Sequence, residues 1–216
     1  WEVALDAGFA HRVQGGVVTA AADDAHSVHL EVTGLRPGRE YFYRFMAGDA
    51  TSPVGRTWTA PDAGAPLERL RIGVASCQSY EQGYYHAWSG MVARGVDLIL
   101  HLGDYIYESG AADAVRRHDP GECTTLDGYR LRHAWYRSDP ALQSAHAACP
   151  WLVTWDDHEV DNDYAGTTPE DPAEQPSFPA RRAAAYRAYW EHMPLPPSAR
   201  PRAGAVALHR SLALGD

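Results

Sequence analysis

The sequence comprises 216 residues, of which 45% are hydrophobic and 11% aromatic, enough to bury one large core or two smaller ones. The formal net charge at pH 7 is -9, and no run of Lys or Arg is long enough to follow a phosphate backbone, so nucleic-acid binding is not expected as a function. No apolar stretch approaches the roughly 20 residues that cross a bilayer, so no transmembrane segment is expected either.

Residues 1–60 predict an antiparallel β module. Short alternating runs of β-branched and aromatic residues are separated by turn residues, as in a β-sandwich, and these runs are 13–24, 26–35, 39–48 and 52–60. Leu35, Pro37 and Tyr41 have the spacing of a tyrosine corner, in which the phenol bonds to upstream backbone. The module resembles a fibronectin type III or Ig-like sandwich with too few strands, and we expect its first strands before Trp1.

Residues 61–69 are rich in Ala, Pro and Gly and predict a linker. A different pattern follows from residue 70 onward. The apolar run at 70–77 predicts a strand covered on both faces, and residues 84–95 have helical spacing that ends in glycine. A second apolar run follows at 96–104. Strand, helix and strand at this spacing predict a βαβ unit with parallel strands.

The remainder of the chain extends this α/β pattern. Residues 126–149 have helical character and predict another crossover, which leads to a third apolar strand within 150–159. Residues 179–193 predict a helix that begins with proline in its first turn.

Chemically active residues follow each of the three predicted strands. They are Cys77, Asp104 and the run Asp156, Asp157 and His158. The carboxyl ends of parallel strands meet at one edge of a sheet, where ligands bind, so these side chains are expected to converge. Several acids in one crevice would repel each other or lose their charge unless cations were present. The sequence therefore predicts a metal site.

The types of ligand indicate which metals fit. Carboxylate oxygens suit hard ions such as calcium, magnesium, manganese or ferric iron, whereas thiolate suits iron or zinc. A mixed set implies more than one metal, or iron. Tyr107 can coordinate only after it loses its phenolic proton, which ferric iron would promote, while Tyr105 is expected to pack in the core.

Two nearby residues allow alternative interpretations. His158 directly follows Asp157, so it is either an acid or phosphate-oxygen donor above a bound substrate, or a surface histidine. Asn162 is either a further ligand, if its loop curls back, or a turn residue.

The three cysteines also leave two alternatives open. In an oxidising compartment Cys123 and Cys149 could form a bridge that leaves Cys77 free; otherwise all three are buried thiols.

Four segments resemble the PhoD-like alkaline phosphatase (alkaline phosphatase D) family of the metallophosphoesterase superfamily. They are "ASCQ" at 75–78, "HLGDYIYE" at 101–108, "TWDDHEVDNDYAG" at 154–166 and "AYRAYWEHMPL" at 185–195. A fibronectin-like module also precedes the catalytic domain in that family. The resemblance runs along essentially the whole chain.

The resemblance implies a secreted, periplasmic or cell-surface enzyme that hydrolyses small or polymeric phosphate esters with metal-activated hydroxide. It implies one ferric ion (Fe3+) and calcium ions (Ca2+). By position, Cys77 and Tyr107 would bind iron, Asp104 would bridge metals, and Asp157 would bind the neighbouring ion. Asn162 would bind calcium.

The same resemblance suggests two catalytic residues. His158 corresponds to the superfamily histidine that contacts phosphate. Arg182, or its neighbour Arg181, would approach a substrate phosphate.

Later metal-binding motifs of the superfamily, of the Gly-Asp-x-His and Gly-His-x-His kind, do not occur in the sequence. Residues 70–216 are therefore expected to be the first half of an α/β/β/α sandwich, and the chain alone is expected to be inactive or to bind metal weakly. Whether a leader was removed or the chain begins within a longer protein stays open. The alternative function is a secreted binding protein with a fibronectin-like module and a purely structural metal site.

Overall fold

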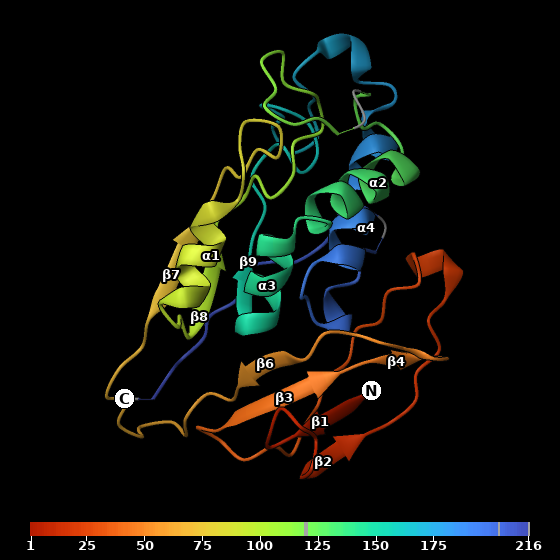
Figure 1. Ribbon diagram of the computed structural model, residues 1–216. Coiled ribbons are helices and arrows are strands. Elements are labelled where there is room, and N and C mark those ends of the chain that lie inside the picture. The colour runs from red at the N-terminus through yellow and green to blue at the C-terminus, as the bar shows by residue number, and fades with distance from the viewer. Residues whose placement is uncertain (119–120, 203, 216) are drawn as a thin grey trace.

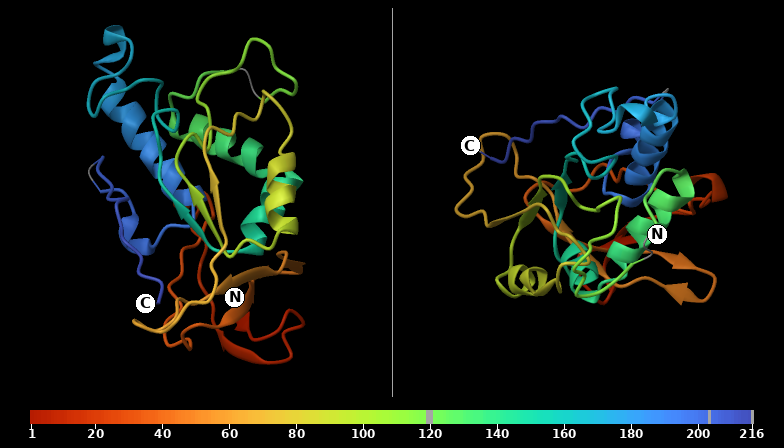
Figure 2. Two further views of the ribbon diagram at one scale, coloured as in Figure 1. Left: turned by 90° about the vertical axis from the view of Figure 1, so that its left-hand side faces the viewer. Right: turned by 90° about the horizontal axis from the view of Figure 1, so that it is seen from above.

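A computed structural model describes residues 1–118, 121–202 and 204–215. An antiparallel sheet occupies one end of the molecule, and a parallel sheet flanked by helices occupies the other (Figures 1 and 2). No helix in the described ranges is long and apolar enough to cross a membrane. The expected order, an antiparallel module followed by an α/β layer, is confirmed.

The N-terminal sheet has four antiparallel strands in the order β2-β1-β3-β6. They are β1 (Glu2–Ala4), β2 (Arg12–Gly15), β3 (Glu40–Arg44) and β6 (Gly55–Trp58), and a small hairpin of β4 (Met46–Ala47) and β5 (Ala50–Thr51) extends from them. Tyr41 is buried, and its hydroxyl accepts a hydrogen bond from the backbone N–H of Arg36 at 2.9 Å. The predicted tyrosine corner is therefore present.

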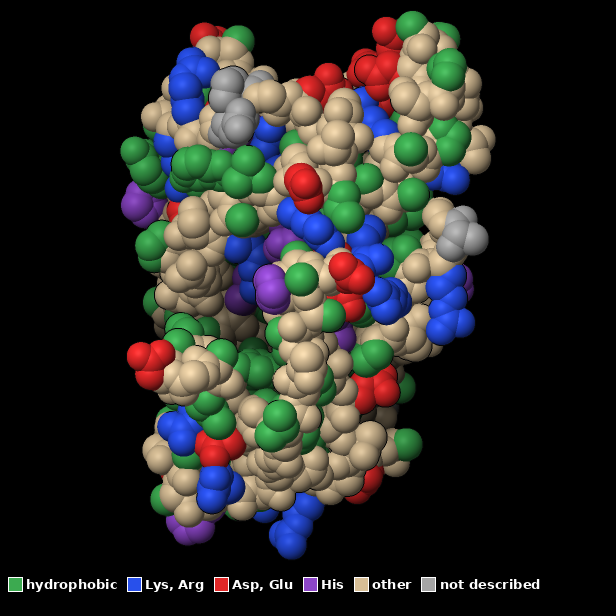
Figure 3. Space-filling model, turned by 90° about the vertical axis from the view of Figure 1, so that its right-hand side faces the viewer, with side chains coloured by type: hydrophobic (Ala, Val, Ile, Leu, Met, Phe, Trp, Pro, Cys, Tyr) green, Lys and Arg blue, Asp and Glu red, His purple; other side chains and the backbone are tan. Residues whose placement is uncertain are grey.

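The strand expected at residues 26–35 is absent. The segment alternates as a strand would, but no described strand lies beside it to share its backbone hydrogen bonds. Instead, Val28, Leu30 and Val32 line a cleft of about 680 Å³ that also borders the end of α4. Figure 3 shows a hollow between the helical region and the N-terminal sheet, with histidine side chains along its upper edge.

The run at 13–24 also contains less strand than predicted. Only β2 and the short 3₁₀ helix η1 (Ala22–Asp24) are regular within it, so the described module is one sheet with a hairpin and not two packed sheets.

The α/β layer contains three parallel strands in the order β7-β8-β9. These strands are β7 (Ile72–Ala75), β8 (Leu98–His101) and β9 (Trp151–Val153). Helix α1 (His86–Ala93) connects the first two, and α2 (Leu126–Arg137) with α3 (Pro140–Ala148) connects the last two. The predicted βαβ arrangement is confirmed.

The second crossover consists of two helices because an N-cap interrupts it. The Asp139 carboxylate accepts hydrogen bonds from the N–H groups of Ala141 at 2.8 Å and Leu142 at 3.2 Å, and Pro140 takes the first helical position. Helix α4 (Phe178–His192) begins with Pro179 in its first turn, as expected. Short 3₁₀ turns, η2 (Pro172–Glu174) and η3 (Pro197–Ala199), flank α4.

Strand β7 is covered on only one face, which corrects the expectation. Gly73 packs toward Met91 of α1, but Ile72 and Val74, on the other face, are 44% and 55% exposed. By contrast, Leu98, which pairs with Ile72 in the central strand β8, is 5% exposed. Strand β7 lies at the edge of the described sheet, and this face of it is left open.

The N-terminal sheet contacts the amino ends of the parallel strands. The indole N–H of Trp58 donates to the carbonyl of Asp97, just before β8, at 2.5 Å. The guanidinium of Arg56 donates to the carbonyl of Ala148, at the end of α3, at 3.0 Å. These contacts lie at the opposite end of the parallel sheet from the strand termini that carry the predicted site (Figure 1).

Cys77, Cys123 and Cys149 are all free thiols, as in the second of the two cysteine alternatives, but only Cys123 and Cys149 are buried. The expectation that Cys77 is buried is wrong, because this residue is exposed.

Candidate metal centre

Gly103 brings the ends of strands β8 and β9 into direct contact. Its φ is +111°, and a Cβ atom at this position would lie 2.4 Å from the backbone nitrogen of Asp156. That distance is far too short for two nonbonded atoms, so a side chain is sterically excluded here. Glycine at this position therefore allows Asp104, the next residue, to lie beside the acids that follow β9.

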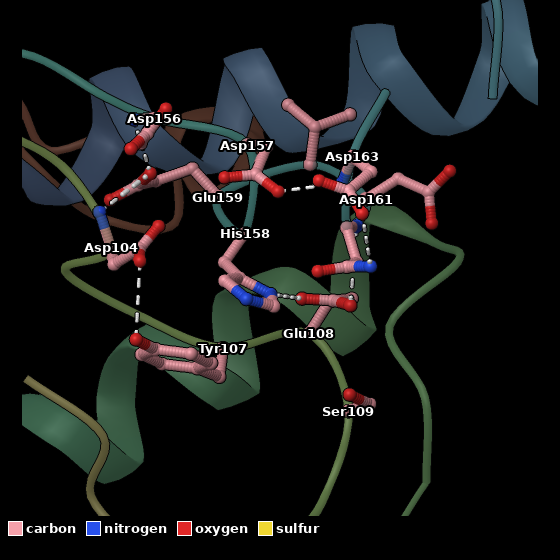
Figure 4. Close-up of polar contacts among 12 residues, drawn as sticks. Asp104, Tyr107, Glu108, Ser109, Asp156, Asp157, His158, Glu159, Asp161 and Asp163 are labelled. Carbon is pink, nitrogen blue, oxygen red and sulfur yellow. Dashed lines mark hydrogen bonds and ion pairs between the residues drawn. The ribbon is translucent and has the colours of Figure 1, made fainter. Parts of the chain in front are cut away.

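Three carboxylates meet at this edge of the sheet. Asp104, Asp156 and Asp157 each offer an oxygen atom, and these atoms all lie within 4.8 Å of one another (Figure 4). The Oδ1 atom of Asp104 is buried and has no hydrogen-bond partner among the described residues. Burial, together with the charges of Asp104 and Asp157, raises the pKa of Asp156. An unpartnered buried oxygen among mutually repelling carboxylates fits a hard cation.

The predicted ligands Tyr107 and Cys77 lie beside this group. The hydroxyl of Tyr107 donates to Oδ2 of Asp104 at 3.1 Å. Burial, and then the charges of Asp104 and Cys77, raise the pKa of Tyr107, so the phenol keeps its proton unless a cation is bound.

The backbone N–H of Cys77 donates to the carbonyl of Gly103 at 3.1 Å, which joins the ends of β7 and β8. Cys77 and Asp104 both have left-handed backbone, with φ of 54° and 52°. Such strained backbone at non-glycine residues is characteristic of functional sites.

His158 is held by a second acid. Its Nδ1 atom lies 2.8 Å from Oε2 of Glu108, and its ring lies against that of Tyr107 with 4.2 Å between centroids. Burial alone would lower the pKa of His158. The hydrogen bond to Glu108 and the charges of Glu108, Asp104 and Asp157 outweigh burial and raise that pKa to about 9. The side chain is 20% exposed, so His158 is accessible from the crevice.

The loop after β9 curls back on itself. The backbone N–H of Asp163 donates to Oδ2 of Asp157 at 2.6 Å. Asn162 donates its backbone N–H to Glu108 and its side-chain amide to Asp163, both at 3.4 Å. The loop thus has the shape that a ligand role for Asn162 requires, but the amide is bonded to Asp163, and that role stays a prediction.

Comparison with known proteins identifies the family. A family model described as "PhoD-like phosphatase" matches residues 72–216, and one described as "PhoD-like phosphatase, N-terminal domain" matches residues 1–61. The chain belongs to the PhoD-like phosphatase family. It is 49% identical over 222 residues to alkaline phosphatase D of Bacillus subtilis (strain 168), covering 100% of this chain and 38% of that protein.

A solved structure also resembles this PhoD-like chain. The structure, described as "Structure of PhoD", matches with a TM-score of 0.97 and 49% identity, covering 100% of this chain and 42% of that one. The chain therefore spans about two fifths of the length of these relatives, 38% of one and 42% of the other.

The two candidate arginines have different environments in the PhoD-like fold. The Arg181 side chain is 3% exposed and forms ion pairs with three carboxylates, those of Glu122, Asp161 and Glu174. Its charge is therefore committed within the protein. Arg182 donates to the carbonyl of Gly166, in the loop that follows the acidic group, and its guanidinium lies 5.8 Å from the centre of the Tyr186 ring. The role of Arg182 toward phosphate stays a prediction.

Three acidic residues of this site were not predicted to have a role. Asp156 was expected at the strand end but not as a ligand, and no function was expected for Glu108 or Glu159. Burial raises the pKa of Glu159 to about 8, against the lowering effect of backbone N–H groups that donate to it. Glu108 stands four residues after Asp104 in an otherwise apolar and aromatic run, and that isolated acid was a usable signal.

Proposed function

We propose that this chain is part of a secreted or cell-surface enzyme that hydrolyses phosphate esters with metal ions, as a phosphomonoesterase or phosphodiesterase of the alkaline phosphatase D type. The observation that carries the proposal is the group of Asp104, Asp156 and Asp157 at the carboxyl ends of two parallel strands, in a chain of the PhoD-like family. The chain would supply the antiparallel N-terminal module and the first half of an α/β/β/α sandwich. The remaining ligands would come from the rest of the full-length protein.

The residues of this chain divide into two metal-binding sets. Cys77 and Tyr107 suit ferric iron because they offer a soft thiolate and a phenolate, whereas Asp157 and Asn162 suit calcium because they offer hard oxygens. Asp104 would help to hold both ions, and its Oδ1 is buried without a hydrogen-bond partner among the described residues. When bound, such ions neutralise phosphate oxygens and activate water for attack on phosphorus.

The chain's own side chains position the substrate. His158, charged below a pH of about 9, can donate a hydrogen bond to a phosphate oxygen from Nε2, because Nδ1 is already bonded to Glu108. A donor fixed in advance stabilises negative charge without reorganisation during the reaction. Arg182 would supply a second positive charge from α4.

The test is an assay of the full-length protein on p-nitrophenyl phosphate and bis-p-nitrophenyl phosphate, with and without chelator. We expect activity that chelator abolishes, and the ratio of the two rates identifies a monoesterase or a diesterase. Absence of activity on both substrates, with metal retained, would favour the alternative of a binding protein with a structural metal site. Activity that chelator leaves unchanged would contradict the metal-dependent mechanism.

The metal content gives an independent test. Elemental analysis of the full-length protein is expected to find iron and calcium, and its visible spectrum is expected to show absorption from tyrosinate bound to ferric iron. A colourless protein without iron would contradict the role given to Tyr107. Residues 1–216 alone are expected to be inactive, and full turnover by this segment would overturn the assignment as a partial catalytic unit.

A further inference from the structure

Glu159 connects the two ligand-bearing strand ends through backbone hydrogen bonds. Its Oε1 atom accepts from the N–H of Tyr105 at 2.5 Å, and its Oε2 atom accepts from those of Asp104 at 3.1 Å and Asp156 at 2.8 Å. The residue is 1% exposed. Figure 4 shows this carboxylate between the loops that leave β8 and β9. One side chain therefore accepts hydrogen bonds from three backbone N–H groups, two of them buried, in the segments that follow two different strands.

The position of these bonds matters because regular pairing stops just before them. The ladder between β8 and β9 ends at the pair His101 and Val153, followed by one bond from the N–H of Thr154 to the carbonyl of His101 at 3.0 Å. Beyond this point the segments that follow β8 and β9 have no regular sheet pairing to fix their separation. The Glu159 carboxylate takes over where the ladder ends.

The backbone conformation of Asp104 also depends on such a restraint. Asp104 has a φ of 52°, in a region that a non-glycine residue adopts at a cost. The bonds from Glu159 to the N–H groups of Asp104 and Tyr105 hold this turn on both sides of the Asp104 side chain. The direction of the Asp104 carboxylate therefore depends on Glu159.

We propose that Glu159 is a positioning residue that sets the separation of the Asp104 and Asp156 carboxylates and thereby the affinity of the site for a hard cation. The inference rests on the proposed metal site. Glu159 does not itself offer a ligand atom to the group of three acids. It acts through the backbone of two residues that do.

The test compares Glu159→Gln with Glu191→Gln in the full-length protein. Glutamine keeps the size of glutamate but turns one acceptor oxygen into an N–H₂ donor, which would then face backbone N–H groups. Glu191 is a matched control because it is also buried, at 4% exposure, and its carboxylate accepts from Arg130 and Arg187 on the α2–α4 side, away from the three acids.

The readout is the binding of terbium(III) to metal-depleted protein, followed by luminescence that nearby tyrosine sensitises. We expect Glu159→Gln to weaken terbium binding about 10- to 100-fold, as is typical for residues that orient metal ligands. Glu191→Gln should retain the wild-type affinity although it loses thermal stability. Equal affinity in Glu159→Gln and wild type would overturn the inference, as would an equal loss of affinity in both variants.

A second variant and a second measurement cover the case in which Glu159→Gln does not fold. Glu159→Asp keeps the charge but shortens the side chain, and it is expected to weaken terbium binding as well. Hydrogen exchange of metal-free Glu159→Asp should be faster than in wild type at the amides of Asp104, Tyr105 and Asp156; unchanged exchange there would contradict the inference. Absence of terbium binding in the wild-type protein would contradict the proposed metal-dependent function itself, and with it the inference about Glu159.

Discussion

His158 and Glu108 are joined by a contact of 2.8 Å between Nδ1 and Oε2, although 50 residues separate them in the sequence. Glu108 follows β8, and His158 follows β9, so the contact crosses the same crevice as the acidic group. The pairing holds the imidazole ring in one orientation and leaves Nε2 for a ligand.

Replacing Glu108 with Gln should move the alkaline limit of activity to lower pH. The pKa of His158 is raised to about 9, so its charged form is present below that value and is lost as pH rises through it. Without the Glu108 charge, this loss begins at a lower pH. We expect kcat/KM at pH 8 to fall about tenfold, part of the contribution of a positioned proton donor.

The measurement for Glu108 is a pH–rate profile of the full-length enzyme. Glu122→Gln serves as the control, because Glu122 is a 46% exposed partner of Arg181 that makes no contact with His158. An unchanged alkaline limit in Glu108→Gln would contradict the prediction.

Replacing Asp104 with Asn should raise the stability of the metal-free protein and abolish its stabilisation by metal. The substitution removes one of three mutually repelling carboxylates and leaves the Tyr107 hydroxyl an acceptor. The metal-free protein is expected to gain about 1 kcal/mol in the free energy of unfolding. Added metal should then no longer stabilise the variant. Urea denaturation with chelator, and again with calcium, measures both effects; a less stable metal-free variant would speak against charge repulsion.

Replacing Gly103 with Ala should disrupt the contact between β8 and β9. A Cβ atom would lie 2.4 Å from the backbone nitrogen of Asp156, so the strand ends must separate. We expect a loss of about 3 kcal/mol or more in the free energy of unfolding, together with metal binding. Gly48→Ala is the control. Gly48 also has a positive φ, of 61°, but nothing lies within 4 Å, so only the conformational cost of about 1 kcal/mol is expected.

The buried histidine His101 should contribute to acid unfolding. Burial lowers its pKa to about 4, so the neutral ring is favoured in the folded state. The free energy of unfolding is unaffected by this group above a pH of about 6.5. It falls by about 3 kcal/mol as pH decreases toward 4, because the unfolded chain binds a proton that the buried ring does not.

His101→Phe keeps an aromatic ring between Trp88 and Trp151 and cannot be protonated. Its unfolding midpoint in acid should therefore lie at lower pH than that of wild type, as followed by circular dichroism. The exposed His11, changed to Gln, should leave the midpoint where it is. A midpoint that is the same in His101→Phe and wild type would refute the assignment.

Substitutions of the two adjacent arginines of α4 should have different effects, one on stability and the other on activity. Arg181→Leu leaves the buried Asp161 without its ion pair and should cost about 3 kcal/mol of stability. Arg182→Leu should lower kcat/KM with little loss of stability. Thermal unfolding and steady-state kinetics of both variants test the distinction, and a catalytic defect only in Arg181→Leu would reverse the assignment.

Local sequence patterns predicted most of the α/β layer. The run at 96–104 contains β8, and the proline-opened run at 179–193 covers α4 except for its first residue, because burial and helix initiation leave local signals. The prediction of a strand at 26–35 was wrong because a strand also needs a neighbouring strand to pair with, and local alternation does not reveal one. The exposure of Val74 in β7 was not foreseen either, since the covering of a sheet face depends on other elements of the fold.

The site was predictable where it depended on strand ends. Asp104 and Asp157 were expected to meet because parallel strands end at the same edge, and they do. The partners Glu108 and Glu159 depend on which way each side chain points within an irregular loop, and no periodicity encodes that. Arg181 and Arg182 are neighbours in the sequence, yet a turn of about 100° between successive helical residues sends one into the protein and the other toward the loop.

The N-terminal sheet contacts the α/β layer on the side away from the acids, through Trp58 and Arg56. It therefore supports the α/β layer from the opposite end and does not cover the crevice that contains the acids. An affinity label or a solid support joined through the β1–β2 end would keep the acidic edge facing outward.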